Sequence, residues 1–224
     1  MVNLGDTFPD FTADTTIGKI RFHDFIKNSW SILFAHPADF TPVCTSELGR
    51  VAKLAPEFEK RGVKLLALSC DDVLSHEQWI EDIKSFACLE TTKGFPFPII
   101  ADEKRELAVK LQMIDPEEKD KDGLPLTCRA VFVIGPDKKL KLSMLYPAST
   151  GRNFDEILRV VDALQLTDKK HVATPSDWKQ GGELMVLPDV KDEDIPKLFP
   201  LGVRYRQVPS GKQYLRLTPQ DDRW

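Results

Sequence analysis

Cys44 is the side chain with the strongest claim to chemistry, because it lies in the stretch HPADFTPVCT, residues 36–45. The stretch follows an apolar run and begins a helical pattern, which places the thiol at a helix N-terminus. A helix N-terminus favours the thiolate, the nucleophilic form of cysteine. Cys44 is therefore a candidate reaction centre.

The other three cysteines, Cys70, Cys88 and Cys128, have ordinary settings beside apolar or helical segments. We expect them to be small buried residues of the core. The four cysteines form no CxxC pair and no Cys/His cluster with zinc spacing. The sequence thus predicts neither a metal site nor a cofactor.

Composition excludes several classes of protein. The chain has 224 residues, 42% of them hydrophobic, and a formal net charge of −4. Lys and Arg are interspersed with Asp and Glu, so we predict no nucleic-acid partner. No apolar run has the length of a membrane span, and the N-terminus has no signal-peptide pattern. With few cysteines, these features predict a cytoplasmic protein with reduced thiols.

Strands and helices alternate along the chain. The patterns predict strands over 29–36, 63–69, 97–101, 129–134 and 140–146, and helices over 48–58, 73–87, 105–113 and 153–166. Pro56 should kink or weaken the first helix, and Gly62 should end it. This order predicts an α/β fold, a mixed sheet with helices on both faces. The loop carrying Cys44 then leaves the C-terminal end of a buried strand, where such sheets place reactive groups.

The character of the chain changes near residue 167. The remainder contains six prolines and lacks long periodic runs. We therefore predict one domain over 1–167 and a small second domain, rich in short strands and turns, over 168–224.

The spacing Pro37-x-x-x-Thr41-x-x-Cys44 resembles the active-site pattern of the peroxiredoxins, thiol peroxidases with a thioredoxin-like fold. Longer segments extend the resemblance to the one-cysteine, peroxiredoxin 6 subgroup over nearly the whole chain. They are HPADFTPVCTSELGR, VKLLALS, PFPIIAD, AVFVIGPDKKLKLSMLYPASTGRNFDEILRVVDALQLT and VATPSDW. The resemblance implies a thioredoxin-like domain, a small C-terminal domain and a homodimer.

The implied activity is reduction of hydrogen peroxide and of organic or lipid hydroperoxides, with Cys44 oxidised to a sulfenic acid. Lowering a thiol pKa by roughly two units gives only a few-fold net gain in rate, because nucleophilicity falls as ionisation rises. Other groups must therefore orient the peroxide. The resemblance assigns this to Arg129, which holds thiolate and peroxide, and to Thr41, which accepts from peroxide and donates to sulfur. Pro37, which lacks an N–H, would shield the sulfenic acid.

His36 and the ion pair of Glu47 with Arg152 have two interpretations each. His36 either polarises the thiol and steadies the pocket, as the resemblance implies, or is a strand-end histidine satisfied by backbone. Glu47 either anchors Arg129 or Arg152, or forms an ordinary surface ion pair with Arg152.

No cysteine follows Cys128, so the C-terminal resolving thiol of two-cysteine relatives is absent. We expect an external thiol to reduce Cys44. The subgroup suggests glutathione, delivered by a glutathione transferase. The alternative from another class is a redox-sensing or chaperone protein that oxidises once and stalls.

Relatives of this subgroup are also associated with a phospholipase A2 activity, whose matching positions here are Ser29, His23 and Asp137. The element reads KNSWS over 27–31, so both glycines of the G-x-S-x-G turn are missing. We expect Ser29 to begin a strand instead.

Overall fold

The computed structural model describes residues 2–90 and 92–221 and divides into two compact units, 1–154 and 155–224. Each unit is described by itself. Within the described residues, no helix combines the length and the apolar character needed to cross a membrane.

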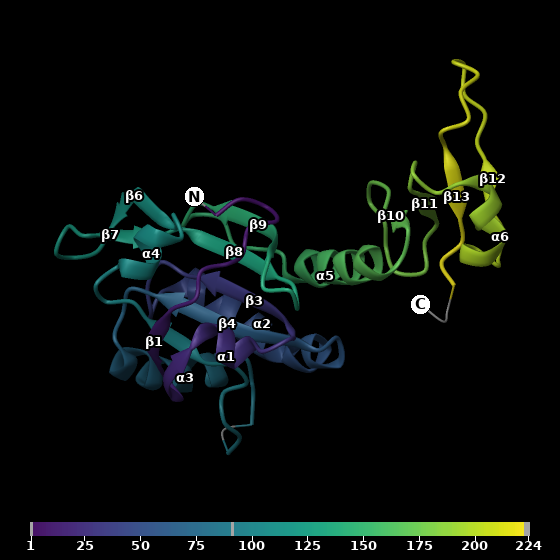
Figure 1. The fold of residues 1–224 in the computed structure, drawn as a ribbon. Coiled ribbons are helices and arrows are strands. Elements are labelled where there is room, and N and C mark those ends of the chain that lie inside the picture. Colours follow the sequence, from purple (N-terminus) through teal and green to yellow (C-terminus); the bar gives the residue numbers. More distant parts are fainter. Residues whose placement is uncertain (1, 91, 222–224) are drawn as a thin grey trace. The chain divides into compact units, whose positions relative to one another are not determined.

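The first unit is built on a seven-stranded mixed sheet in the order β2-β1-β5-β4-β3-β8-β9 (Figure 1). Its strands are β1 Thr12–Thr15, β2 Gly18–Arg21, β3 Trp30–Ala35, β4 Val63–Ser69, β5 Ile99–Ala101, β8 Arg129–Ile134 and β9 Leu140–Tyr146. Strands β3, β4 and β5 are parallel, whereas β8 runs antiparallel to β3. A separate hairpin pairs β6 Ile114–Lys119 with β7 Pro125–Thr127.

Helices flank this sheet. They are α1 Phe22–Ile26, α2 Pro42–Lys60, α3 Val73–Phe86 and α4 Glu106–Lys110. Leu33 and Leu66 of the central strands share one core cluster with α1 and α4. Phe34 points to the opposite face, where its ring packs edge-on against Phe97. The predicted α/β fold with a thioredoxin-like mixed sheet is thus confirmed.

The central strand β3 positions the candidate site. All six of its residues are buried, as expected for an apolar run in the middle of a sheet. The strand ends at Ala35, a loop covers 36–41, and α2 begins at Pro42. The chain therefore delivers Cys44 to the C-terminal edge of the parallel strands.

Pro56 lies inside α2, which continues to Lys60, and Gly62, which was expected to end the helix, follows it at a positive φ of 64°. The N-terminal strands β1 and β2 and the β6–β7 hairpin were not predicted. Strand β6 has the sequence IDPEEK, and a proline among charged residues is typical of a loop.

The second unit contains most of α5 Phe154–Lys169 and a small antiparallel sheet in the order β10-β11-β13-β12. Its other elements are β10 Val172–Ala173, β11 Leu184–Val186, a 3₁₀ turn Asp192–Asp194, α6 Ile195–Leu198, β12 Arg204–Tyr205 and β13 Arg216–Thr218. Their core includes Trp178, Leu184 and Phe199. The expected short strands and turns are present, and the domain boundary at 167/168 stays a prediction.

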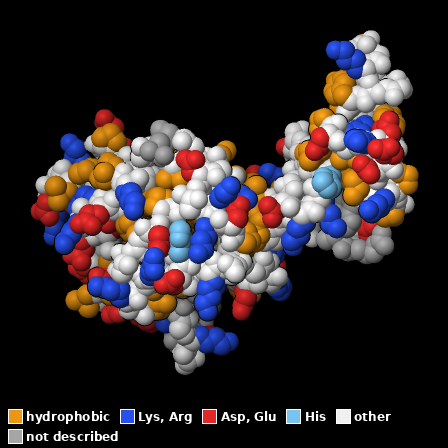
Figure 2. Space-filling view, viewed as in Figure 1, with side chains coloured by type: hydrophobic (Ala, Val, Ile, Leu, Met, Phe, Trp, Pro, Cys, Tyr) orange, Lys and Arg blue, Asp and Glu red, His pale blue; other side chains and the backbone are white. Residues whose placement is uncertain are grey.

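Acidic and basic side chains intermingle on the face of each unit shown in Figure 2. On that face, blue and red side chains alternate and do not form a basic stripe. This agrees with the interspersed charges of the sequence.

Candidate active site

Cys44 is the third residue of α2, and its side chain is completely buried. Thr41 is the N-cap residue, with an extended backbone, and the first intrahelical bond runs from the amide of Thr45 to the carbonyl of Thr41 at 3.0 Å. The amides of Val43 and Cys44 therefore precede the hydrogen-bonded ladder. Such N–H groups make a helix N-terminus a site for negative charge.

Arg129, the first residue of β8, brings a fixed positive charge to the sulfur. Its Nη1 donates to the Sγ of Cys44 at 3.3 Å and to Oε2 of Glu47 at 2.8 Å. Its Nε and Nη2 donate to the carbonyl of Ala148 at 2.9 and 2.5 Å. Among the described residues, these bonds occupy four of the five N–H groups of the guanidinium, so one Nη2–H remains for a substrate oxygen.

Glu47 lies one turn after Cys44 and joins two arginines. Its Oε1 accepts from the amide and Nε of Arg152 at 2.6 and 3.0 Å, and its Oε2 accepts from Nη2 of Arg152 at 2.7 Å. Burial alone would raise the pKa of Glu47, but the guanidinium groups of Arg152 and Arg129 hold it below its usual value. Both partners are buried, so the surface ion-pair interpretation is wrong.

Arg152 also ties the site to the sheet. Its Nη1 donates to the carbonyls of Ala35 and Ala130 at 2.8 and 2.7 Å, which are the end of β3 and the start of β8. The side chain thus fixes the strand ends that carry the loop to Cys44 and the guanidinium of Arg129.

The charges of this cluster are unequal when the cysteine is a thiol. Two guanidinium groups face one carboxylate, which leaves one excess positive charge in a buried region. A thiolate at Cys44 makes the cluster neutral. Because an unpaired buried charge is costly, this geometry suits the nucleophilic form.

Thr41 and Pro37 lie in the loop before α2. The hydroxyl of Thr41 donates to the carbonyl of Ala38 at 2.9 Å. A hydroxyl has a single proton, so Thr41 does not donate to the sulfur in this conformation, in contrast to the expectation; its lone pairs stay able to accept. Pro37 is buried, as a shielding role requires.

His36 follows neither interpretation in full. Its ring is buried, and Nε2 lies 2.8 Å from Oδ1 of Asp39, so a carboxylate and not a backbone group satisfies it. The atom Nδ1 has no hydrogen-bond partner among the described residues. His76 contacts the same carboxylate at 2.7 Å. Sequence reasoning missed Asp39 and His76, although Asp39 is only three residues after His36.

Asp39 is the centre of this second cluster. Burial would raise the pKa of Asp39, but hydrogen bonds from His36 and His76 hold it far below its usual value. His36, Asp39 and Asp71 place one nitrogen and two carboxylate oxygens within 4.8 Å of one another. The His36 ring bonds the Asp39 carboxylate, and the Asp71 carboxylate accepts from the Asp39 amide at 3.0 Å.

The remaining cysteines differ from Cys44. Cys70 and Cys128 are buried, as expected, whereas Cys88 is exposed, so the expectation of burial is wrong there. Burial raises the pKa of the Cys70 thiol to about 12, and it also raises that of Cys128. Within the described part of the chain, neither thiol has a guanidinium hydrogen bond of the kind that Arg129 makes to Cys44.

The three residues of the possible lipase site have separate contacts. The ring of His23 bonds the carbonyl of Phe8 at 2.8 Å, and Asp137 pairs with Lys141 at 2.9 Å in the β8–β9 turn. Ser29 does not begin the strand, in contrast to the expectation; it lies in the turn before β3, where its amide bonds the carbonyl of Ile26. No hydrogen bond among the described residues joins any two of the three.

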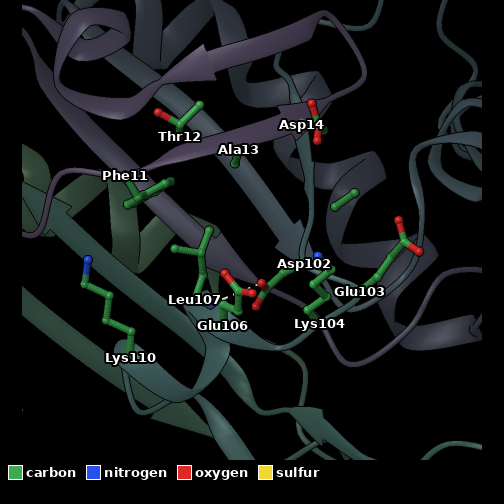
Figure 3. Close-up of a pocket in the computed structure, with 11 residues that line it drawn as sticks. Phe11, Thr12, Ala13, Asp14, Asp102, Glu103, Lys104, Glu106, Leu107 and Lys110 are labelled. Carbon is green, nitrogen blue, oxygen red and sulfur yellow. Dashed lines mark hydrogen bonds between the residues drawn. The ribbon is translucent and has the colours of Figure 1, made fainter.

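A cavity of about 370 Å³ lies elsewhere, between β1, β5 and α4 (Figure 3). Asp102 points into this region, and its oxygens accept from the amides of Leu107 and Ala108 at 3.1 and 2.7 Å. Burial raises the pKa of Asp102 despite those bonds. None of the candidate catalytic residues lines this cavity.

Two family models and several curated proteins match this chain. Residues 4–143 match the AhpC/TSA family, and residues 163–198 match the C-terminal domain of 1-Cys peroxiredoxin. The chain is 64% identical to peroxiredoxin-6 of Homo sapiens, over 97% of each chain, and 65% identical to that of Gallus gallus, over 98% of each.

Solved structures agree. A cysteine-to-serine mutant of peroxiredoxin 6 from Arenicola marina matches with a TM-score of 0.96 at 60% identity, covering 99% of this chain and all of that one. A yeast mitochondrial 1-Cys peroxiredoxin matches at 0.87 and 45% identity, covering 98% of this chain and all of that one. The chain belongs to the peroxiredoxin family, in its one-cysteine peroxiredoxin 6 subgroup, and is a thiol-dependent peroxidase.

Proposed function

We propose that Cys44 is the peroxidatic cysteine and that it reduces hydrogen peroxide and organic hydroperoxides, lipid hydroperoxides included. One observation carries the proposal: the buried sulfur lies 3.3 Å from Nη1 of Arg129, at the N-terminus of α2. This arrangement presents a nucleophile and several donors to the same small volume.

The reaction follows from these positions. The Cys44 thiolate attacks one oxygen of the peroxide, an S–O bond forms, the O–O bond breaks, and hydroxide or alkoxide leaves and takes a proton. The products are a sulfenic acid and water or an alcohol. The remaining Nη2–H of Arg129 and the amides of Val43 and Cys44 stabilise charge on the departing oxygen.

The loop residues complete the site. Thr41 accepts a hydrogen bond from the peroxide, and Pro37 covers one side of the sulfur. His36 steadies the pocket from the end of β3. Glu47 and Arg152 act behind Arg129, where they hold its guanidinium in place through buried ion pairs.

An external thiol then reduces the sulfenic acid. We propose glutathione, delivered by a glutathione transferase: one thiol forms a mixed disulfide with loss of water, and a second releases Cys44 as a thiol. The yeast mitochondrial relative is described as resolved through glutathione/thioredoxin systems. Cys70 is a poor internal resolver because burial suppresses its thiolate.

We also propose a homodimer in the cytoplasm, with no nucleic-acid partner. The four cysteines are free, which suits a reducing compartment. Sedimentation of the reduced protein tests the dimer, and a mass near that of one chain would refute it.

The test of the peroxidase proposal is stopped-flow mixing of the reduced protein with hydrogen peroxide or a lipid hydroperoxide, followed by mass spectrometry of the added oxygen. Oxygen is expected on Cys44 first, with repeated turnover when glutathione and a transferase are present. Cys44→Ser should abolish the reaction, and Cys70→Ser should retain it. A single oxidation that stalls with ample reductant would instead support a redox sensor.

Hydrolase activity at Ser29 is the less favoured proposal. His23 and Asp137 make their hydrogen bonds elsewhere, and the turn lacks its glycines. Lipase activity that survives in Cys44→Ser and disappears in Ser29→Ala would revive it.

A further inference from the structure

A buried polar cluster lies beside the catalytic loop, and two of its members, Asp39 and His76, have no role in the reaction described above. Asp39 accepts from His36 Nε2 at 2.8 Å, from His76 Nδ1 at 2.7 Å and from the Ser75 hydroxyl at 2.9 Å. Both imidazole rings are completely buried. Polar networks of this kind are kept only where every member is satisfied or has a role.

The protonation state of the His76 ring follows from its hydrogen-bond partners. Its Nε2 lies 3.2 Å from the carbonyl of Ile100, which can only accept. Its Nδ1 contacts a carboxylate, which also accepts when ionised. Both ring nitrogens must therefore carry a proton, so His76 is an imidazolium whose charge the Asp39 carboxylate balances.

The protons of His36 follow in turn. Its Nε2 must donate to Asp39, because that carboxylate has no proton to give. A second proton, on Nδ1, would be a buried donor with no hydrogen-bond partner among the described residues. His36 is then neutral, and its Nδ1 is a bare acceptor, the ring atom without a partner among the described residues.

Two chains of contacts connect this cluster to Cys44. The His36 ring lies 5.0 Å from the ring of Trp79, whose Nε1 donates to the Thr45 hydroxyl at 3.1 Å, one residue after the cysteine. The carbonyl of Ala38, next to Asp39, holds the hydroxyl of Thr41 at 2.9 Å. Asp39 therefore holds the loop at His36, and the neighbouring residue Ala38 holds it at Thr41.

We propose that Asp39 and His76 are positioning residues of the peroxidase site: their buried ion pair fixes His36 as the Nε2–H tautomer and presents its Nδ1 as an acceptor beside the Cys44 loop. The inference rests on the proposed role of Cys44. Among the described residues, the titratable groups of this network are His36 and Asp39 of the loop, Asp71 after β4 and His76 of α3, and β5 contributes the Ile100 carbonyl.

The first test reads the tautomers directly. The sequence has four histidines, so ¹⁵N-histidine NMR of the reduced full-length protein can be assigned with His23→Gln and His171→Gln variants. At pH 7 we expect one doubly protonated ring, His76, and one ring protonated at Nε2 alone, His36. A neutral His76 or a His36 protonated at Nδ1 would overturn the inference, and this result needs no substitution within the cluster.

The second test connects the tautomer to the reaction. Asp39→Asn leaves one neutral acceptor oxygen for three donors, so it should abolish the His76 cation. We expect the rate of Cys44 oxidation by hydrogen peroxide to fall roughly tenfold, in the range expected for a misplaced reacting group, with a new histidine titration in the pH–rate profile. Ser75→Ala is the matched control, because it removes a neutral bond to the same carboxylate; its pH–rate profile should equal that of the wild type.

The outcomes separate the two proposals. If Cys44 reacts and Asp39→Asn changes neither rate nor pH profile, the positioning role is wrong and the peroxidase role stands. If peroxide leaves Cys44 unmodified, the peroxidase role is wrong whatever the tautomers are. Should Asp39→Asn fail to fold, His76→Asn, which keeps a donor without the charge, is expected to show the same rate loss, and an unchanged rate would refute the inference.

Discussion

Cys44 and Cys70 are two buried thiols near the same edge of the sheet, and they differ in the charges beside them. Cys44 follows the loop after β3 and touches a guanidinium, whereas Cys70 comes directly after β4. Burial raises the pKa of Cys70 to about 12; Arg105 lowers it only partly, and Asp102 and Asp71 raise it further. Burial alone therefore makes a thiol inert, and a fixed cation with a helix N-terminus makes one reactive.

The largest expected effect comes from removing the cation. Arg129→Ala should give Cys44 a setting like that of Cys70 and slow its oxidation by about 10²–10³-fold, the usual loss for a donor aimed at developing charge. Stopped-flow rates with hydrogen peroxide measure it. Arg129→Lys keeps a positive charge without the forked guanidinium donors, so its oxidation rate should fall between those of the wild type and Arg129→Ala. A wild-type rate in Arg129→Ala would show that the guanidinium is not what distinguishes Cys44 from Cys70.

Glu47, which pairs with the Arg129 guanidinium, should contribute mainly to the stability of the fold. Glu47→Gln leaves Arg129 and Arg152 buried without their counter-ion, and such unpaired charges cost about 3–5 kcal/mol. Urea unfolding measures the loss. Glu57→Gln, a partly exposed carboxylate of the same helix, is the control and should cost much less, because solvent screens its ion pairs. Equal losses in the two variants would contradict a special role for the buried pairs.

Lowering the pH should destabilise the folded protein through the two buried carboxylates near Cys44. The pKa values of Glu47 and Asp39 are lowered in the folded protein. Their contribution to stability is therefore complete above the unfolded pKa near 4 and is lost as the pH falls below it. Urea unfolding between pH 7 and pH 3 should show this decline, and Glu47→Gln should show a shallower one. Parallel curves would contradict the assignment to Glu47.

The smallest effect is expected at the second thiol. Cys70→Ala should leave peroxide turnover within about twofold of the wild type and cost about 1 kcal/mol of stability through the lost packing. Stopped-flow and urea unfolding measure the two quantities. A stalled sulfenic acid in this variant would identify Cys70 as an internal resolver.

The sequence predicted the parts of the fold that local patterns determine. The apolar runs at 29–36, 63–69 and 129–134 are strands, and the helix at Cys44 begins where its loop ends. Strands β1 and β2 were not predicted because their alternation of apolar and polar residues is short and mostly polar. Tertiary pairing with β5 stabilises them, and pairing of that kind leaves no local pattern.

The site was predictable only in part. The spacing of Pro37, Thr41 and Cys44 is local and was identified directly. The two bonds of Arg152 to Glu47 and the bond of His76 to Asp39 join residues 105 and 37 positions apart, and charge alone does not distinguish such buried pairs from surface ones. Only the fold decides which charged side chains are removed from water.

The complete burial of Cys44 sets unequal demands on the two halves of the catalytic cycle. Hydrogen peroxide is about as small as a pair of water molecules and needs only a narrow opening to reach the sulfur. A thiol reductant larger than the peroxide can approach the oxidised sulfur only when the groups that cover it move aside. Recovery of the enzyme then requires a wider local opening of the site than its oxidation does.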